Sequence, residues 1–412
     1  MKVNRQHFFR FIVIAMIAAF TINLFILNIN RYYSGPVIFF TAVSLIVAFL
    51  YRRFFNIHEI SLYLLYAMML VTSFVHSNSF RAATILYSGM FVLSFISYRR
   101  LLRTNCLSVV TFLNVIKRII YLYAAVLIIQ QVSVLIGFPV FNRSMIFKNA
   151  YKLNSLAWEP SYVGSTITLL AYSYFTLQKK ISKLSLKKLL YLDRRMWIAY
   201  FYVIFTCGSA HTLFIGSVFF LYLAGKRFSF WFVAFFTFIV ISVFIFTKAD
   251  SLLEIEAVRR LVRIIPATLM LDTSTIIDTD LSAAARIAPP LFYLNWFNPL
   301  DINYWIGHGI DFSKNTIIVY LLDSDQFMEQ GNATGGLFPA YFLDYGLISG
   351  IMFFICLKKF ALGKIFSFPT LLWIICFLSQ SFNTVMQWMF WIIMTTTLFF
   401  ENEVLRNSQE GK

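Results

Sequence analysis

The stretch SLAWEPSYVGSTITLL, residues 155–170, places a carboxylate and a proline directly in front of an apolar run. Pro160 suits the first turn of a helix, because its missing N–H needs no partner there, and Trp158 suits the interface between lipid and water. The run therefore predicts a membrane-spanning helix that starts near residue 160. A carboxylate buried in lipid is costly, so Glu159 is interpreted either as a helix N-cap or as a residue that borders a polar cavity at the outer membrane surface and contacts a sugar or a basic partner.

The composition excludes an ordinary soluble globular domain. Of the 412 residues, 59% are hydrophobic and only 13% are charged, and the mean hydropathy is +0.74. Because each crossing needs roughly 20 apolar residues, we predict an all-α polytopic membrane protein with about 12 transmembrane helices. The seventh and eighth candidates are short enough to form a helical hairpin or a re-entrant pair. The candidate spans are residues 8–30, 33–51, 58–76, 80–98, 118–138, 160–178, 196–208, 210–225, 228–247, 334–357, 365–382 and 384–400.

The formal net charge of +17 raises the question of nucleic-acid binding, which the distribution of the charge answers. With the N-terminus in the cytoplasm, most basic residues fall in the segments on that side, as the positive-inside rule requires. The basic charge is therefore interpreted as a topology signal that faces anionic membrane lipid, and no nucleic-acid partner is expected. The basic segments 99–118 and 179–195 are interpreted as cytoplasmic surface segments without a catalytic role. The first span is interpreted as a retained signal anchor.

The chain divides into three parts. Residues 1–247 carry the first nine predicted helices, residues 248–332 form one long external loop, and residues 333–412 carry the last three helices and a cytoplasmic tail. The loop holds most of the acidic residues, and its length predicts that it folds over the membrane face. Within it, residues 251–265 have apolar positions close to the helical period, and Pro266 would end that helix.

Several classes of chemistry lack their motifs. The chain contains neither GxxxxGK[ST] nor a strand-flanked GxGxxG, which argues against ATP-driven transport and cytoplasmic nucleotide-sugar chemistry. HExxH is absent, and the four scattered cysteines indicate neither a disulfide framework nor a metal site. We therefore expect no metal ion and no cofactor.

The external loop contains two candidate sites. Arg286, within SAAARIAPPLFYLNW, is flanked by alanines that would let a large ligand approach, and an arginine can hold a phosphate in a bidentate grip. In WIGHGID, residues 305–311, Gly307 and Gly309 flank His308, so the backbone can turn tightly or approach a ligand closely. His308 is a candidate proton carrier near neutral pH. Each of these side chains is equally consistent with a purely structural or solvated position.

Two further candidates lie within predicted spans. TCGSAHTLFIGS, residues 206–217, interrupts an apolar hairpin with small polar residues and His211. Small residues permit close helix packing, whereas a histidine inside the membrane can also face a cavity. GGLFPAYFLDYGLISG, residues 335–350, carries Asp344 just inside a span. This carboxylate is expected to pair with an arginine or a helix terminus rather than to face lipid.

The order of these motifs resembles that of a known family. An EP dipeptide that opens a middle span is followed by a GSAHT turn, a long external loop with an arginine, WIGHGID near the end of that loop, and FLDYGLISG in the next span. This series, over about residues 155–355, is similar to that of the O-antigen polymerase family, within the O-antigen polymerase and ligase superfamily of bacterial membrane glycosyltransferases. The resemblance implies the glycosyltransferase C-type architecture.

The resemblance also implies residue roles. Arg286 resembles the loop arginine that binds the donor diphosphate, with Arg259, Arg260 and Arg263 of the loop helix as further cations. Gly307 and Gly309 match the GxG turn of the family, while Asp344 and Gly346 match its acidic-x-Gly element. The sequence departs from the family pattern at two places. It has His211 where the family often has an arginine, and Thr334–Gly336 where ligases often show a His-Asn pair. The second departure favours a polymerase.

The implied reaction joins oligosaccharide repeat units linked to undecaprenyl diphosphate, at the outer face of the bacterial cytoplasmic membrane. A base must accept the proton of the acceptor hydroxyl, and the candidates are Glu159, His308 and His211, in that order. Membrane lipid and a polysaccharide chain-length regulator are the other expected partners. An O-antigen ligase and a lipid-linked oligosaccharide flippase are the alternatives, but a flippase would be expected to show two related halves.

Overall fold

The computed structural model describes residues 2–28, 34–51, 57–76, 81–142, 153–224, 297–313 and 336–410, with residues 275, 289, 290, 293 and 294. These parts are helical, and they contain no strand beyond one isolated bridge between Asn28 and Ser34. The α-helices are α1 (Lys2–Thr21), α2 (Gly35–Tyr51), α3 (Ile60–Val75), α4 (Ala82–Leu102), α5 (Val109–Ile136), α6 (Pro160–Ser182), α7 (Leu186–Leu192), α8 (Arg194–Thr206), α9 (Ala210–Ala224), α14 (Ile302–Ile306), α16 (Phe342–Leu357), α17 (Phe368–Phe377) and α18 (Val385–Glu410). The short helices are η1 (Phe25–Leu27), η2 (Ile57–Glu59), η6 (Leu337–Tyr341) and η7 (Lys358–Leu362).

The all-α prediction is confirmed for these residues, and the predicted span near residue 160 begins as helix α6 at Pro160. By length and composition, two helical stretches are long and apolar enough to cross a membrane. They are Val109–Ile136, with a mean hydropathy of 2.2, and Leu337–Leu362, with 1.8. The total of twelve spans stays a prediction. The candidate span 228–247, the loop helix 251–265 and the four loop arginines lie outside the described residues.

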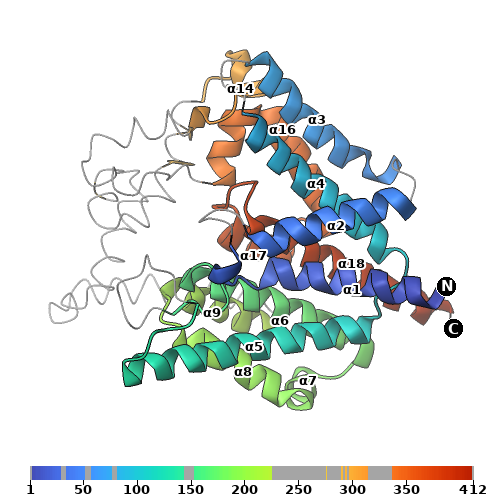
Figure 1. Ribbon diagram of the computed structural model, residues 1–412, viewed down its shortest axis with the longest axis vertical. Coiled ribbons are helices and arrows are strands. Elements are labelled where there is room, and N and C mark those ends of the chain that lie inside the picture. Colours follow the sequence, from blue (N-terminus) through green and yellow to red (C-terminus); the bar gives the residue numbers. More distant parts are fainter. Residues whose placement is uncertain are drawn as a thin grey trace.

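The helices pack in layers that Figure 1 shows from one side. Helices α5, α6, α8 and α9 form one layer, and α6 also packs on α18. Helix α2 contacts both α1 and α4, while α3 contacts both α4 and α16. The two ends of the chain lie on the same side of this bundle (Figure 1).

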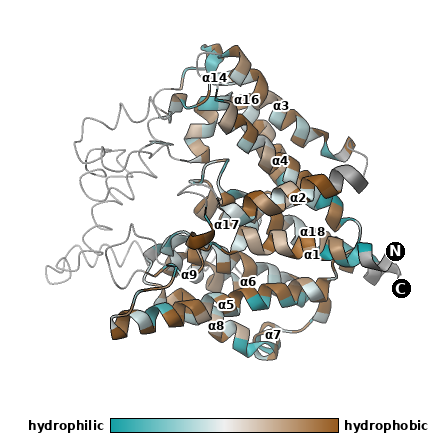
Figure 2. Ribbon diagram, viewed as in Figure 1, coloured by the Kyte–Doolittle hydropathy of each residue, from teal (hydrophilic) through white to brown (hydrophobic). Residues whose placement is uncertain are grey.

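The outward faces of several helices are apolar. Figure 2 shows hydrophobic colouring along α5 and α3, and hydrophilic colouring around the short helix α7. On α5, Leu135 is 82% exposed, and Leu122, Ile128, Ile129 and Val132 are also exposed. A single exposed leucine needs no explanation, but a row of exposed leucine, isoleucine and valine side chains along one long helix requires one.

The predicted basic surface segment 99–118 requires correction. Helix α4 continues to Leu102 and α5 starts at Val109, so most of the segment is helical. Arg99 and Arg100 are buried, because both approach the carboxylate of Glu59. The second basic segment, 179–195, contains the short helix α7, in which Lys187 and Lys188 are exposed and Leu189 is buried.

Candidate functional site

Two of the motifs that the sequence separates by more than thirty residues lie directly against each other. The turn after α14 packs on the first turns of α16, and the contact is made by the backbones of both segments. The His308 N–H donates to the Leu343 carbonyl at 2.9 Å, and the Gly309 N–H donates to the Asp344 carbonyl at 3.1 Å. The GxG turn and the acidic-x-Gly element of the sequence therefore form one structural unit.

This backbone contact depends on two glycines. Gly307 has φ 97°, and a Cβ atom there would lie 2.7 Å from the carbonyl carbon of Tyr345. Gly346 interrupts helix α16 with φ 81° and ψ 166°, and a Cβ atom there would overlap the Trp305 carbonyl oxygen and the Gly307 nitrogen. Only glycine readily adopts the Gly346 conformation and leaves room for the opposing chain. Thr72 of α3 adds a further bond, since its hydroxyl donates to the Ile306 carbonyl at 2.6 Å.

The same contact positions two carboxylates. Asp344 accepts the Ser313 N–H at 2.8 Å through Oδ1, and it lies half-buried in the first turn of α16. Asp311 has φ 64° and pairs with Arg81 at 2.6 Å, although the Arg81 side chain is mostly exposed. The expectation that Asp344 lies at a helix terminus rather than facing lipid fits this geometry, since Asp344 lies in the first turn of α16 and its hydrogen-bond donor is a backbone amide.

Both carboxylates line a cavity of about 580 Å³, called here the Asp344 cavity. Its wall combines aromatic rings with hydroxyl and amide groups. Among the lining residues are Trp158 and Tyr162, which flank the EP dipeptide in sequence, and Tyr341 of η6. A cavity of this size with a few converging polar groups is typical of a small-molecule site. Residues of the WIGHGID and FLDYG motifs therefore line one cavity together with two neighbours of the EP dipeptide.

Asn23 lines the Asp344 cavity from the end of α1. Both polar atoms of its amide are buried, and neither has a hydrogen-bond partner among the residues that the structure describes. Buried polar groups in proteins are nearly always hydrogen-bonded, and leaving one unsatisfied costs about 1–3 kcal/mol. An amide group can both donate to and accept from a sugar hydroxyl, so this side chain is suited to a polyhydroxylated ligand.

Glu159 lies beside the cavity rather than in its wall. It occupies the N-cap position of α6, but its side chain makes no capping hydrogen bond. Instead a carboxylate oxygen accepts a 3.3 Å hydrogen bond from the Ser161 hydroxyl. Its neighbours Ala157, Trp158 and Tyr162 line the cavity, whereas Glu159 does not. The N-cap position predicted from the sequence is confirmed, and direct contact of Glu159 with a substrate stays a prediction.

His308 is held by packing. Its ring stacks on Phe312 at 4.3 Å between centroids and meets the edge of Tyr304 at 4.9 Å. Nδ1 lies 3.2 Å from the Leu343 carbonyl oxygen, and Nε2 lies 3.9 Å from an Asp301 oxygen. Burial lowers the pKa of His308, while the Leu343 carbonyl and the Asp301 carboxylate oppose that shift. The ring lies outside the lining of the Asp344 cavity, so the structure does not bring this predicted base to the carboxylates.

The GSAHT turn packs against the helix that the EP dipeptide opens. The Thr212 hydroxyl donates to the Pro160 carbonyl at 2.9 Å, and a Cβ atom on Gly164 would lie 2.6 Å from the Thr212 Cα. The small residues therefore permit close packing of α9 on α6, as the first interpretation of this segment predicted. His211 is half-buried in the first turn of α9 and does not line the Asp344 cavity.

Some cavity residues were not singled out from the sequence. Asp311 belongs to the WIGHGID motif, and its acidic side chain two residues after Gly309 was a usable signal. Asn23 and the QSFNT segment, residues 380–384, also line the cavity. Both are polar interruptions between apolar runs, which is a general property of membrane-protein loops, so the sequence alone gave no reason to prefer them.

The chain has no match among protein-family profiles, curated proteins or solved structures. Within the described residues, no group of three His, Cys, Asp or Glu side chains could hold a metal ion. The cysteines Cys106, Cys207, Cys356 and Cys376 are free and buried. The predicted donor-site residues Arg259, Arg260, Arg263 and Arg286 lie outside the described residues.

Proposed function

We propose that this chain is a membrane glycosyltransferase that polymerises oligosaccharide repeat units carried on undecaprenyl diphosphate. The observation that carries the proposal is the backbone contact between residues 306–309 and 343–346 at a polar, aromatic cavity. The family resemblance rests on the order of short motifs, and two of those motifs, with the neighbours of the EP dipeptide, contribute to this one place. The ligase and the flippase remain alternatives that the experiment below separates.

The character of the Asp344 cavity supports a sugar ligand. Tyr87, Trp158 and Tyr162 supply aromatic surfaces, and Asn23 supplies an amide that has no hydrogen-bond partner within the described part of the chain. Aromatic rings with a polar edge combine apolar contact area with hydrogen bonding. A lipid tail would need neither the carboxylates nor the amide, so a glycan headgroup matches the lining better than an acyl chain does.

The reaction requires one bond to form and one to break. The terminal hydroxyl oxygen of one repeat unit attacks the anomeric carbon of the growing chain, and the bond from that carbon to the diphosphate breaks. Undecaprenyl diphosphate leaves with the bonding electrons, and the hydroxyl proton passes to a base. We assign that base to Asp344, because it lines the cavity and is held by Ser313, whereas Glu159 and His308 do not line it.

The leaving diphosphate requires positive charge. No lysine or arginine lines the Asp344 cavity among the residues that the structure describes. The external loop 248–332 is then the source of that charge, and Arg286 is the proposed diphosphate-binding residue, with Arg259, Arg260 and Arg263 as further cations. A cation held near a developing negative charge stabilises a transition state without a metal ion.

The proposal places the protein in the cytoplasmic membrane, with the Asp344 cavity at the outer face. Helices α4, α6, α16 and α18 each begin at the Asp344 cavity, which is consistent with four even-numbered spans that run inward from the outer face. The exposed apolar residues of α5 would contact lipid. We therefore propose twelve spans with both termini in the cytoplasm.

The test is a gel of surface polysaccharide from a deletion strain that is complemented with single variants at equal membrane levels. We expect Asp344→Asn, Arg286→Ala and Arg286→Lys each to reduce the polymer ladder to a single repeat unit. Lys188→Gln serves as the control, because it removes an exposed charge on α7, outside the Asp344 cavity. The lysine variant keeps the charge of Arg286 but loses the bidentate grip.

An unchanged ladder in Asp344→Asn would remove Asp344 from the reaction, and an unchanged ladder in both Arg286 variants would remove Arg286. Loss of even the single capped unit would indicate a ligase or a flippase. Full-length polymer in the deletion strain, with repeat units accumulating on the inner leaflet, would also indicate a flippase.

A further inference from the structure

A second and larger cavity lies at the other end of the helix bundle. It has a volume of about 1180 Å³ and is called here the Arg99 cavity. Helices α4, α6 and α18 reach from one cavity to the other, and so does the continuous stretch of α16 and η7. The Arg99 cavity therefore opens at the end that the proposed topology places in the cytoplasm.

The lining of the Arg99 cavity is basic. Glu401 pairs with Lys180 at 3.0 Å, so Glu403 is the one lining acid left to balance the other cations among the described residues. Polar side chains such as Asn105 and Ser367 lie between the charges. The basic lining residues are Arg99, Arg103, Lys180, Lys359, Lys364 and Arg406.

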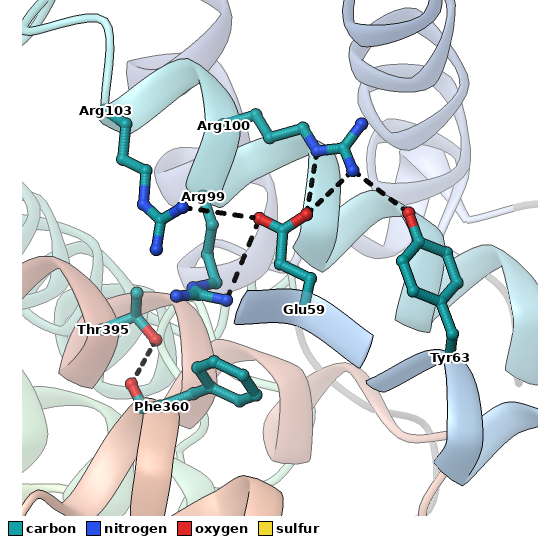
Figure 3. Close-up of polar contacts among 7 residues, drawn as sticks. All are labelled: Glu59, Tyr63, Arg99, Arg100, Arg103, Phe360 and Thr395. Atoms are coloured by element: carbon teal, nitrogen blue, oxygen red, sulfur yellow. Dashed lines mark hydrogen bonds and ion pairs between the residues drawn. The ribbon is translucent and has the colours of Figure 1, made fainter. Parts of the chain in front are cut away.

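A buried ion cluster behind the wall adds to this excess of positive charge (Figure 3). Glu59 is fully buried, and Arg100 binds one of its carboxylate oxygens through two nitrogens at 2.9 and 2.8 Å. Arg99 and Arg103 reach only the other oxygen, at 4.0 and 3.9 Å, which is beyond hydrogen-bonding distance. One carboxylate therefore faces three guanidinium groups.

Arg99 has unused capacity for hydrogen bonding. Its side chain is 10% exposed, its guanidinium lies over the ring of Phe360 at 4.0 Å, and no described residue forms a hydrogen bond with its Nη1 atom. A buried, incompletely paired guanidinium is costly unless an anion completes it. The cavity that Arg99 lines is where such an anion would bind.

The rim of the Arg99 cavity is suited to a membrane surface. Phe366 is 100% exposed and Ile365 is 51% exposed, and both lie next in sequence to the cavity residues Lys364 and Ser367. Within the cavity, Leu362 and Leu398 supply apolar wall. Exposed apolar side chains beside cations are typical of segments that lie at the interface between lipid and water.

We propose that the Arg99 cavity binds the phosphate group of an anionic phospholipid from the inner leaflet. Guanidinium and ammonium groups supply charge-assisted hydrogen bonds to phosphate oxygens, and basic pockets between transmembrane helices on the cytoplasmic side are suited to lipid headgroups. The phospholipid would complete the charge of Arg99 and fix the ends of α4, η7 and α18. This site is separate from the proposed glycosyl transfer, and its test uses no glycan.

The test measures binding of fluorescent phosphatidylglycerol and of fluorescent phosphatidylcholine to the purified full-length protein in detergent. The variant is Lys359→Gln with Lys364→Gln, since both lysines line the cavity and are exposed, so the fold tolerates their replacement. The matched control is Lys358→Gln with Lys188→Gln, which removes the same charge at exposed positions outside the cavity. Inorganic phosphate is added as a competitor in a separate arm.

Each basic residue near an anionic surface contributes about 1 kcal/mol, and the cavity variant lacks two of them. We therefore expect this variant to bind phosphatidylglycerol roughly 30-fold more weakly. The control variant should match the unaltered protein, and phosphatidylcholine should bind weakly throughout. Equal weakening in both variants, or equal binding of the two lipids, would overturn the proposal. If phosphatidylglycerol does not bind but inorganic phosphate does, the lipid assignment is overturned and the cavity is a site for free phosphate.

Discussion

The replacement of Gly346 by alanine should separate the two motifs that form the candidate site. At most helix positions a Gly→Ala change stabilises a protein by about 0.4–1 kcal/mol. Gly346 lies within the bounds of helix α16 but has φ 81°, and its neighbour across the contact is the backbone of Trp305 and Gly307 rather than a flexible side chain. The sign of the effect should therefore reverse.

The magnitude follows from two contributions. The backbone conformation of Gly346 is strained for any other residue, at about 1–3 kcal/mol. If the added methyl group forces the segments apart, the bonds from His308, Gly309 and Ser313 to residues 343 and 344 are lost, at about 1 kcal/mol each. The sum is about 4–6 kcal/mol, which is a large part of the stability of an ordinary domain.

The assay is the thermal midpoint of the purified protein in detergent, read by size-exclusion chromatography after heating. Gly137→Ala is the matched control, because Gly137 also has a positive φ, 72°, at the end of α5, but a Cβ atom there meets nothing within 4 Å. The control should cost only about 1–2 kcal/mol, the strain of a left-handed residue.

The comparison between the two variants tests the reasoning directly. We expect Gly346→Ala to melt well below Gly137→Ala and to lose the polymer ladder. If the two thermal midpoints coincide, the WIGHGID and FLDYG segments do not pack as closely as the structure shows. The main evidence that the two motifs form one cavity would then be lost.

Three further predictions concern other parts of the molecule. Glu59→Gln should destabilise the protein by about 3–5 kcal/mol in thermal unfolding, because it leaves buried guanidinium groups uncompensated, whereas Glu401→Gln, at a partly exposed pair, should cost less than about 1 kcal/mol. Burial lowers the pKa of His308 in the folded protein, so the unfolded state binds the His308 proton more readily. The thermal midpoint should therefore fall as the pH drops through about 6.5, and His308→Phe should remove the share of this pH dependence that comes from His308. Asn23→Ala should leave the membrane level unchanged and shorten the polymer ladder on a gel, because its amide lines the Asp344 cavity and has no hydrogen-bond partner in the described ranges. An unchanged ladder would exclude Asn23 from substrate binding.

The fold was predictable where one physical rule dominated. Long apolar runs have to form helices in a membrane, and within the described residues each predicted run overlaps a helix, although α1 ends at Thr21 and α5 begins at Val109, well away from the predicted bounds. The start of α6 followed from Pro160, since the ring removes a donor that the first turn does not need. Helix ends governed by long-range contacts were not predictable. Helix α4 continues through Arg99 and Arg100 because Glu59, some forty residues earlier, compensates their charge.

The candidate site was predictable only in part. Gly307, Gly309, Asp344 and Gly346 stood out because glycine and a lone carboxylate are unusual in an apolar sequence, and they lie together. Asn23 gave no such signal, because its burial without a partner depends on how α1 ends against the start of α6. His308 looked like a proton carrier from its chemistry alone, yet its surroundings are aromatic rings and a carbonyl.

The basic residues at the end that the proposed topology places in the cytoplasm show why a rule based on residue counts can miss a site. The positive-inside rule depends on how many cations each segment holds, and it says nothing about which of them meet after folding. Arg99, Lys180, Lys359 and Arg406 lie at the ends of four different elements, and the packing of those elements brings them around one cavity. A set of like charges placed together in this way repels itself, since each pair of neighbours is destabilising. Charges that serve orientation alone would be as effective spread over the surface, so their convergence, with Arg99 buried and incompletely paired, favours an anionic ligand at this end of the bundle.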